Sequence, residues 1–214
     1  MDWCWRGRLP YAQALDEQRT HRRAILEGRA DSVLWLLEHD PVVTTGRRVP
    51  EGTASRSEMT SRNVDFYETE RGGLATYHGP GQLIGYLICD IGEYDLSVRK
   101  TICGIEEGLI RWLAGFGLTA SRRKGFPGVW INNDKIAALG LHFRKGVSMH
   151  GFALNLTVDL APYDLIVPCG ITDGGVTSLS HLVDDDVPNP VDAASSVAQC
   201  ILDALGMSGP LRNC

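Results

Sequence analysis

Residues 70–82 constrain the fold of this chain more than any other stretch. Glycines at 72, 73, 79 and 81 bracket a short strand-like core at 74–77, and the apolar run 83–88 follows directly. Glycine permits positive φ and lets a ligand lie against the backbone. The pattern predicts a buried strand behind a loop that grips a ligand. Two tight turns joining antiparallel strands are the alternative.

Polar side chains are interleaved with these glycines, and they favour the binding loop over simple turns. They comprise a cation, a hydroxyl, an imidazole and an amide: Arg71, Thr76, His78 and Gln82. We therefore expect a ligand to be held here.

Length and composition suit one domain over residues 1–214. A chain of 214 residues that is 43% hydrophobic can bury a sizeable core, and no Ser/Pro/Gly-rich or single-charge tract divides it. The first eight residues hold no apolar segment, and no run of about 18 apolar residues occurs anywhere. Neither export nor membrane insertion is expected.

The cysteines point to a reducing compartment. Six of them, at 4, 89, 103, 169, 200 and 214, are scattered without C-x-x-C spacing. The scattered positions argue against a disulfide framework and against a structural zinc site. We expect a cytoplasmic protein without a metal, with most of these thiols buried.

The net charge of −5 conceals an asymmetry. Acidic residues dominate from 151 onward, whereas basic clusters lie upstream at 47–48, 122–124 and 144–145. Such clusters could receive an acidic partner protein, although ordinary solvated faces are the alternative. Nucleic-acid binding is not favoured, because the pI is about 5.7 and aromatic residues do not interleave with the basic ones.

Hydrophobic periodicity predicts helices and hairpins. Helical spacing occurs at 10–26, 98–113 and 190–205, the last with Asn189 as its cap. The apolar positions expected to be buried include Ala12 in the first of these helices and Val191 in the last. Strand-like runs occur at 32–37, 64–68, 83–88, 128–131, 135–143 and 150–156, and 47–62 is predicted to be an irregular loop. Hairpins with helices set apart indicate an α+β fold with mixed or antiparallel sheets.

Cys169 is the candidate nucleophile, because Pro168 and Gly170 frame it at a strand end or turn. The alternative is a buried small hydrophobe. A cysteine nucleophile must be a thiolate, and a reference pKa near ~8.5 means that it needs a cationic neighbour. His78, His150 and Lys135 are the candidates, and their residue types do not rank them. For Lys135 the alternative is a surface position with its amine in water.

Three motifs, in order, resemble those of the lipoyl (octanoyl) protein transferase family. Residues 71–83 resemble its Arg-Gly-Gly-x-x-Thr-Tyr-His-Gly-Pro-Gly-Gln-Leu signature, and Lys-Ile-Ala-Ala-Leu-Gly at 135–140 resembles its catalytic-lysine strand. His-Gly-Phe-Ala-Leu-Asn at 150–155 continues to the cysteine segment at 162–171. The resemblance covers roughly residues 10–205. Val43 departs from it, because the family has an aromatic residue there.

The resemblance implies a biotin/lipoate-ligase-like catalytic domain and an octanoyl-acyl carrier protein:protein N-octanoyltransferase, an acyltransferase of lipoate biosynthesis. In the implied reaction Cys169 takes the octanoyl (or lipoyl) group from acyl carrier protein as a thioester, and Lys135 is its partner. The acceptor is a lysine amine on lipoyl domains of 2-oxoacid dehydrogenase complexes or on glycine cleavage H protein. No ATP, metal or bound coenzyme is implied.

The resemblance also assigns an acyl pocket, in which small side chains would admit a straight C8 chain worth about 0.8 kcal/mol per buried CH₂. For His78 and His150, hydrogen-bonded core positions are the alternative. Backbone N–H groups near 72–73, 139–140 or 151 could stabilise an oxyanion. The implied pocket residues are Arg71, Gly72, Gly73, Leu74, Ala75, Thr76, Tyr77, His78, Ala138, Leu139, Gly140, His150, Gly151, Phe152 and Ala153.

Three other readings compete with the acyltransferase. An ATP-dependent lipoate or biotin ligase would need a phosphate-binding glycine/basic loop and would not need Cys169. A non-catalytic module that binds lipoyl domains would not need the Lys135 and Cys169 pair. A metal site at His78, His150 and Cys169 lacks any recognisable ligand spacing.

Overall fold

The computed structural model describes residues 1–46, 56–166, 174–184 and 186–207. The strands are β1 (Asp2–Leu9), β2 (Val33–His39), β3 (Val42–Thr45), β4 (Asp65–Glu68), β5 (Thr76–His78), β6 (Gln82–Ile88), β7 (Ser121–Arg123), β8 (Phe126–Ile131), β9 (Asp134–Arg144) and β10 (Val147–Asn155). The α-helices are α1 (Tyr11–Leu26), α2 (Arg56–Ser61), α3 (Val98–Ala114) and α4 (Pro190–Ala204). Short 3₁₀ turns are η1 (Ile91–Tyr94), η2 (Ala161–Leu165) and η3 (Leu179–His181).

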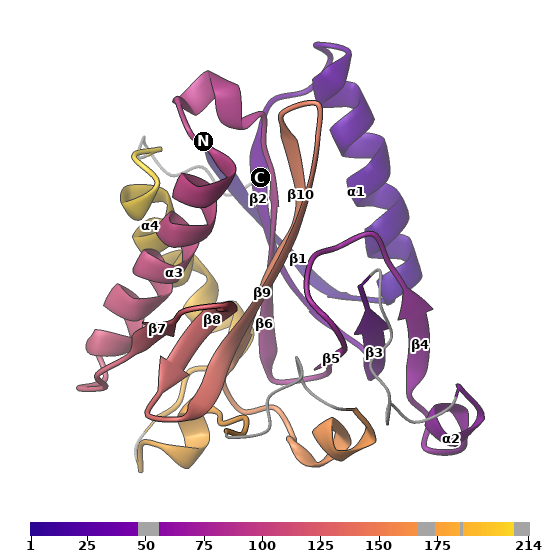
Figure 1. Cartoon of the computed structure of the whole chain (residues 1–214), viewed down its shortest axis with the longest axis vertical. Helices are drawn as coiled ribbons and strands as arrows, with labels where there is room; N and C mark the ends of the chain where they lie inside the picture. Colours follow the sequence, from indigo (N-terminus) through magenta and orange to yellow (C-terminus); the bar gives the residue numbers. More distant parts are fainter. Residues whose placement is uncertain (47–55, 167–173, 185, 208–214) are drawn as a thin grey trace.

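Two sheets form the framework. The larger has the order β1-β2-β6-β10-β9-β8-β7, in which only the β1–β2 pair is parallel. The smaller has the order β4-β3-β5, with β3 parallel to β4 and antiparallel to β5. Helices α3 and α4 cover one face of the large sheet, and α1 covers the other (Figure 1). The predicted α+β fold with mixed sheets is confirmed.

Strand β10 is buried along its whole length because both faces of the large sheet are covered. Phe152 and Leu154 join the core under α3 and α4, whereas Ala153 joins the core under α1. This division follows from the two-residue period of a strand. The alternation predicted at 150–156 therefore separates two cores rather than a core from solvent.

Most predicted elements are confirmed, and three details are wrong. In α1 the buried alanine is Ala14 and not Ala12, which is exposed. In α4, Asn189 caps the helix through the Asp192 N–H at 3.1 Å, but Val191 is 49% exposed. The loop predicted at 47–62 contains the helix α2, and residues 47–55 of that prediction lie outside the described residues.

Two further observations bear on the sequence predictions. Within the described ranges, no helix combines the length and the apolar character needed to cross a bilayer. Cys4 is disulfide-bonded, although no disulfide framework was expected, whereas Cys89, Cys103 and Cys200 are free. Of these four described cysteines only Cys4 and Cys89 are buried, so the prediction that most thiols are buried is not confirmed.

Candidate active site

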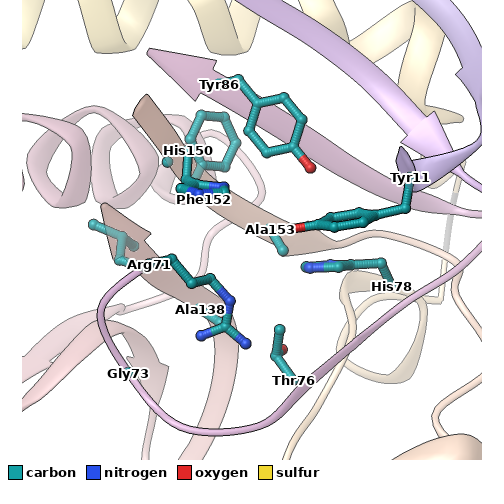
Figure 2. A pocket seen from close by; sticks show the side chains of 13 residues that line it. Tyr11, Arg71, Gly73, Thr76, His78, Tyr86, Ala138, His150, Phe152 and Ala153 are labelled. Atoms are coloured by element: carbon teal, nitrogen blue, oxygen red, sulfur yellow. The ribbon is translucent and has the colours of Figure 1, made fainter. Parts of the chain in front are cut away.

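A pocket lies where the segment 70–78 passes over the α1-covered face of the large sheet. The space between its walls, open solvent at the mouth included, is about 450 Å³. Side chains from α1, β5, β6, β9 and β10 converge on it, as Figure 2 shows. The lining residues are Tyr11, Arg71, Gly73, Thr76, His78, Tyr86, Ala138, Leu139, Gly140, His150, Gly151, Phe152 and Ala153.

Small residues form the sheet side of this pocket. Ala138 lies opposite Ala153 across the β9–β10 ladder, and Gly140 lies opposite Gly151 two residues further along. A Cβ atom on Gly140 would lie 2.7 Å from the Gly72 carbonyl oxygen, so this approach of loop to sheet requires glycine. A Cβ atom on Gly151 would likewise overlap the Gly85 carbonyl oxygen, so it is the alanine pair, with only methyl side chains, that leaves space for an extended, unbranched ligand.

Arg71 fixes the loop side of the pocket. Its guanidinium donates to the Thr44 carbonyl at 2.6 Å and to the Thr44 hydroxyl at 2.9 Å, both on β3. It also donates to the Gly72 carbonyl at 2.9 Å. The side chain is only 8% exposed. Because these bonds join the loop to β3, Arg71 stabilises the position of the loop as well as lining the pocket.

A chain of amides fixes the tautomer of His78. The Asn155 amide donates to the Thr177 carbonyl, so its oxygen accepts from Gln82 Nε2 at 2.8 Å. Gln82 Oε1 is then the acceptor that faces His78 Nδ1 at 2.7 Å, and Nδ1 must carry the proton. Burial lowers the pKa of His78 to about 3, so the ring is neutral at pH 7 with a lone pair on Nε2.

His39, behind the pocket wall, is fixed by the same logic. Its Nδ1 faces the Leu9 carbonyl at 2.7 Å and must donate, so its Nε2 accepts from the Tyr86 hydroxyl at 2.6 Å. Burial lowers the pKa of His39 to about 4 and raises that of Tyr86 well above its usual value. Burial likewise raises the pKa of Tyr11 to about 12. The polar groups around the pocket are therefore mostly uncharged.

His150 is held in an unusual backbone conformation. Its φ is 61°, which is uncommon outside glycine, and its backbone N–H donates to Gln18 Oε1 on α1 at 2.9 Å. Its Nε2 is buried without a hydrogen-bond partner. Burial lowers the pKa of His150 to about 3, although the nearby Glu70 carboxylate opposes this. The alternative of a fully hydrogen-bonded core histidine therefore fits His78 better than His150.

Lys135 occupies a smaller chamber next to the pocket. Thr76 and Ala138 line both spaces, and Asn155 and Tyr163 help to close the chamber. The lysine is only 5% exposed, so the surface alternative does not hold. Its ammonium lies 4.8 Å from the centre of the Trp130 ring, a cation–π contact. A buried amine beside a slot is typical of a functional lysine.

Cys169, the predicted nucleophile, lies outside the described residues. The described chain on either side of that gap borders the Lys135 chamber. Before the gap, Ile166 packs in one apolar cluster with Ala75 and Tyr163, and Val176 after the gap packs against the same cluster. The backbone carbonyl of Lys135 accepts a hydrogen bond from the Thr177 N–H, and the backbone N–H of Lys135 donates to the Gly175 carbonyl, both at 3.0 Å.

The structure brings most predicted pocket residues together. Eleven of the fifteen line the pocket, Gly72 lines an adjoining surface depression, and Ala75 lines the Lys135 chamber. Leu74 lines neither space, and the ring of Tyr77 packs at 5.7 Å against that of Tyr163 instead. Their roles in binding stay predictions. Among the described residues, no three His, Cys, Asp or Glu side chains cluster as metal ligands would.

Sequence reasoning missed Tyr11 and Tyr86. Tyr11 opens α1 directly after Pro10, and its ring lies parallel to that of His78 at 6.3 Å. Tyr86 is the one aromatic residue in the apolar run 83–88, which the pattern predicts only to be a buried strand. A polar hydroxyl within a buried strand was the available signal, because such a group must find a partner.

Comparison with known proteins places the chain in a family. The model of the lipoyl protein ligase A/B catalytic domain matches residues 10–204. The chain is 44% identical over 195 residues to an octanoyltransferase of Acidobacterium capsulatum, covering 84% of this chain and 79% of that protein. It is 41% identical over 185 residues to a mitochondrial octanoyl-[acyl-carrier-protein]:protein N-octanoyltransferase of Danio rerio, covering 85% and 82%.

Solved structures agree on the fold. A lipoate-protein ligase A bound with ATP superposes with a TM-score of 0.76 at 16% identity, covering 100% of this chain and 90% of that one. A biotin protein ligase of Aquifex aeolicus in complex with biotin and ATP reaches a TM-score of 0.57 at 11% identity, covering 96% and 70%. The predicted biotin/lipoate-ligase-like fold is therefore confirmed.

Proposed function

Because the chain belongs to the lipoyl protein ligase A/B catalytic domain family, we propose that it is an octanoyltransferase of protein lipoylation. The observation that carries the proposal is the 44% identity to an octanoyltransferase over most of both chains. The pocket is consistent with this substrate, because the facing Ala138 and Ala153 leave room for an unbranched chain beside a buried amine. The octanoyl group comes from acyl carrier protein and passes to the lysine of a lipoyl domain.

The first half-reaction forms an acyl-enzyme. The Cys169 thiolate attacks the thioester carbonyl of the donor, so that a bond from Sγ to carbon forms and the bond from carbon to the phosphopantetheine sulfur breaks. The Lys135 ammonium gives its proton to the departing thiolate. One thioester replaces another, so this exchange needs no energy source. The burial of Lys135 next to the pocket supports its role.

The second half-reaction forms the amide. The lysine amine of the acceptor attacks the octanoyl-Cys169 thioester, and Lys135, now neutral, takes a proton from the attacking nitrogen. The bond from carbon to Sγ breaks, and Cys169 leaves as a thiolate. The greater stability of an amide over a thioester drives this half. The lone pair that the amide chain leaves on His78 Nε2 gives the pocket a neutral acceptor for a polar group.

Intact-mass measurement tests this proposal. Incubation of the protein with octanoyl-acyl carrier protein and without ATP should add one octanoyl group, labile to hydroxylamine and absent in Cys169→Ser. Cys103→Ser is the matched control, because Cys103 is an exposed free thiol outside the pocket, and it should still be acylated. An adduct on another residue would remove Cys169 from its role. A strict need for ATP would favour a ligase instead.

A further inference from the structure

Trp130, on β8, is the residue that the Lys135 ammonium contacts. The lysine Nζ lies 4.8 Å from the centre of the indole ring, and the exposed fractions of Lys135 and Trp130 are 5% and 1%. Among the described residues, the amine of Lys135 has no hydrogen bond and no carboxylate within ion-pair distance. In this part of the chain, the face of the ring is therefore the group that offsets the cost of burying the charge.

A β-bulge turns Lys135 toward that ring. Val129 on β8 pairs with Ala137 on β9. The next pair along is Trp130 with Lys135, so β9 has one extra residue, Ile136, at this point. In an uninterrupted strand Lys135 would share a face with Ala137, which lies in the core under α3 and α4. The bulge puts Ile136 into that core as well and turns Lys135 to the opposite face.

Strand β8 presents a glycine and the tryptophan to this lysine. Val129 lies in the core under α3 and α4, so Gly128 and Trp130 on either side of it face the other way. A Cβ atom on Gly128 would lie 2.5 Å from the Ala137 carbonyl oxygen and 3.3 Å from Lys135 Cε. The lysine stem therefore passes over Gly128, and its ammonium reaches the next residue on that face of β8.

The indole ring is held in one orientation. Trp130 Nε1 donates to the Phe126 carbonyl of the same strand at 3.2 Å. The Phe126 ring lies at 6.4 Å from the indole, with an angle of 78° between the two planes. Rotation of the indole would break the hydrogen bond and disturb a closely packed site. The ring thus gives a fixed surface to a lysine whose stem is long and flexible.

Arg123, from the basic cluster at 122–124, also lies against this ring. Its guanidinium carbon is 5.1 Å from the centre of the Trp130 ring and 5.0 Å from that of Phe126. One explanation of Trp130 is therefore that it stabilises Arg123. Of the two cations, however, it is Lys135 that lines the chamber beside the pocket. The two explanations predict different kinetics.

Resting on the proposed octanoyl transfer and on the role of Lys135 in it, we propose that Trp130 is a positioning residue. Its ring face holds the Lys135 ammonium at the place from which the proton passes to the departing thiolate. A general acid has to lie within hydrogen-bond reach of the atom that it protonates. Without the ring the lysine would adopt other rotamers, and a displacement of about 1 Å is enough to slow a reaction. Trp130 acts through Lys135 and does not line the acyl pocket.

A double-mutant cycle tests the inference. Trp130→Leu should lower kcat with octanoyl-acyl carrier protein by about tenfold. The KM for this donor should not change, because the pocket is intact. In the Lys135→Met background the same substitution should alter the residual rate by less than about twofold. A ring with a purely structural role would lower the rate by the same factor in both backgrounds.

A second cycle separates the two cations. In the Arg123→Gln background, Trp130→Leu should still lower kcat by about tenfold. If the ring served Arg123 alone, the effect of Trp130→Leu would disappear in that background.

Fluorinated tryptophan at position 130 separates the charge distribution of the ring from its shape. Fluorine withdraws electron density from the ring face and hardly changes its size, so kcat should fall stepwise as fluorine atoms are added. This measurement does not depend on the folding of Trp130→Leu. Trp130→Phe, which keeps a ring face, should retain more activity than Trp130→Leu. The matched control is fluorinated tryptophan at the buried Trp112 on α3, which should leave kcat unchanged.

Two results would overturn the inference. One is an equal effect of Trp130→Leu with Lys135 and with Lys135→Met, and the other is a kcat that does not respond to fluorination of Trp130. Loss of the Trp130→Leu effect in Arg123→Gln would assign the ring to Arg123 instead. Failure of the proposed function would look different, because the unmodified protein would then transfer no octanoyl group, or Lys135→Met would be fully active.

Discussion

Three buried histidines lie in or behind the wall of the pocket as neutral rings. The pKa values of His39, His78 and His150 are lowered by burial to about 4, 3 and 3. An unfolded histidine titrates near 6.5, so below that pH the unfolded chain binds protons that the native protein does not. Burial of these neutral rings therefore leaves the folded protein at its full stability above about pH 6.5, and the free energy of unfolding decreases as the pH falls toward 3.

We expect the share of this loss that comes from a single histidine to be measurable. The free energy of unfolding should fall by up to about 1.4 kcal/mol per pH unit for each such histidine between pH 6.5 and 4. His78→Gln should make that slope shallower by about one histidine's share, whatever its effect on stability at pH 7. His181→Gln, a histidine at the surface, is the control. Identical slopes in urea titrations of His78→Gln and the unmodified protein would contradict the burial argument.

Removal of the buried amine should stop the chemistry without destroying the pocket. Lys135→Met keeps most of the length of the side chain and deletes the ammonium group that lies over the Trp130 ring. Acyl transfer should fall by a factor of about 10² to 10⁴, the usual contribution of a proton-transfer group. The reaction of Cys169 with iodoacetamide near pH 7 should slow as well. The control, Lys100→Met on α3, should change neither rate. An unchanged iodoacetamide profile in Lys135→Met would show that the Lys135 amine does not activate the Cys169 thiol.

At the scale of single residues, the sequence identified only those pocket residues that a local pattern reveals. Arg71, His78 and Lys135 stand beside glycines or at a strand start, where local pattern shows them. Tyr11 and Tyr86 reach the pocket only because α1 packs across β6 and β10, which is a long-range contact. No local window in the sequence contains that information.

At the scale of elements, the paired rows on β9 and β10 set the width of the pocket. Ala153→Val should narrow the slot at the second strand, and its two added methyl groups should displace about two CH₂ groups of the acyl chain. At about 0.8 kcal/mol per CH₂, preference for octanoyl over hexanoyl donors should fall roughly tenfold. Competition between the two donors measures this ratio. Ala12→Val, on the exposed side of α1, should leave it unchanged, and equal ratios in both variants would place the chain elsewhere.

Elements with strong periodicity were predictable, and those that depend on pairing were not. Helix α3 and the hairpin of β8 and β9 follow from spacing and from Asn132, whose φ of 52° suits a tight turn. Strand β1 was missed, because Asp2–Leu9 alternates poorly and is a strand by virtue of pairing with β2. The short helix α2 is stabilised by Met59, which packs into the small-sheet core.

At the scale of the whole molecule, the two cores share their central strands. β6 and β10 send alternate residues to the α3–α4 side and to the α1 side, and tryptophans report on both: Trp112 on the first and Trp35 on the second. We propose one domain and expect one cooperative unfolding transition. Fluorescence and far-UV circular dichroism should give coincident midpoints in urea, whereas two separated transitions would show that the cores unfold independently.

The glycine pair on β9 and β10 has a consequence for redesign. Glycine has no side chain left to remove, and a Cβ at either position would overlap neighbouring backbone, so the sheet side of the slot can be narrowed only at Ala138 and Ala153 and cannot be hollowed further. Capacity for a bulkier acyl group has to be gained opposite the sheet, where Arg71 and Thr44 tie the loop to β3. Directed evolution toward longer acyl substrates should therefore select substitutions at the Arg71–Thr44 contact. Selection for shorter acyl substrates should instead select substitutions in β9 and β10.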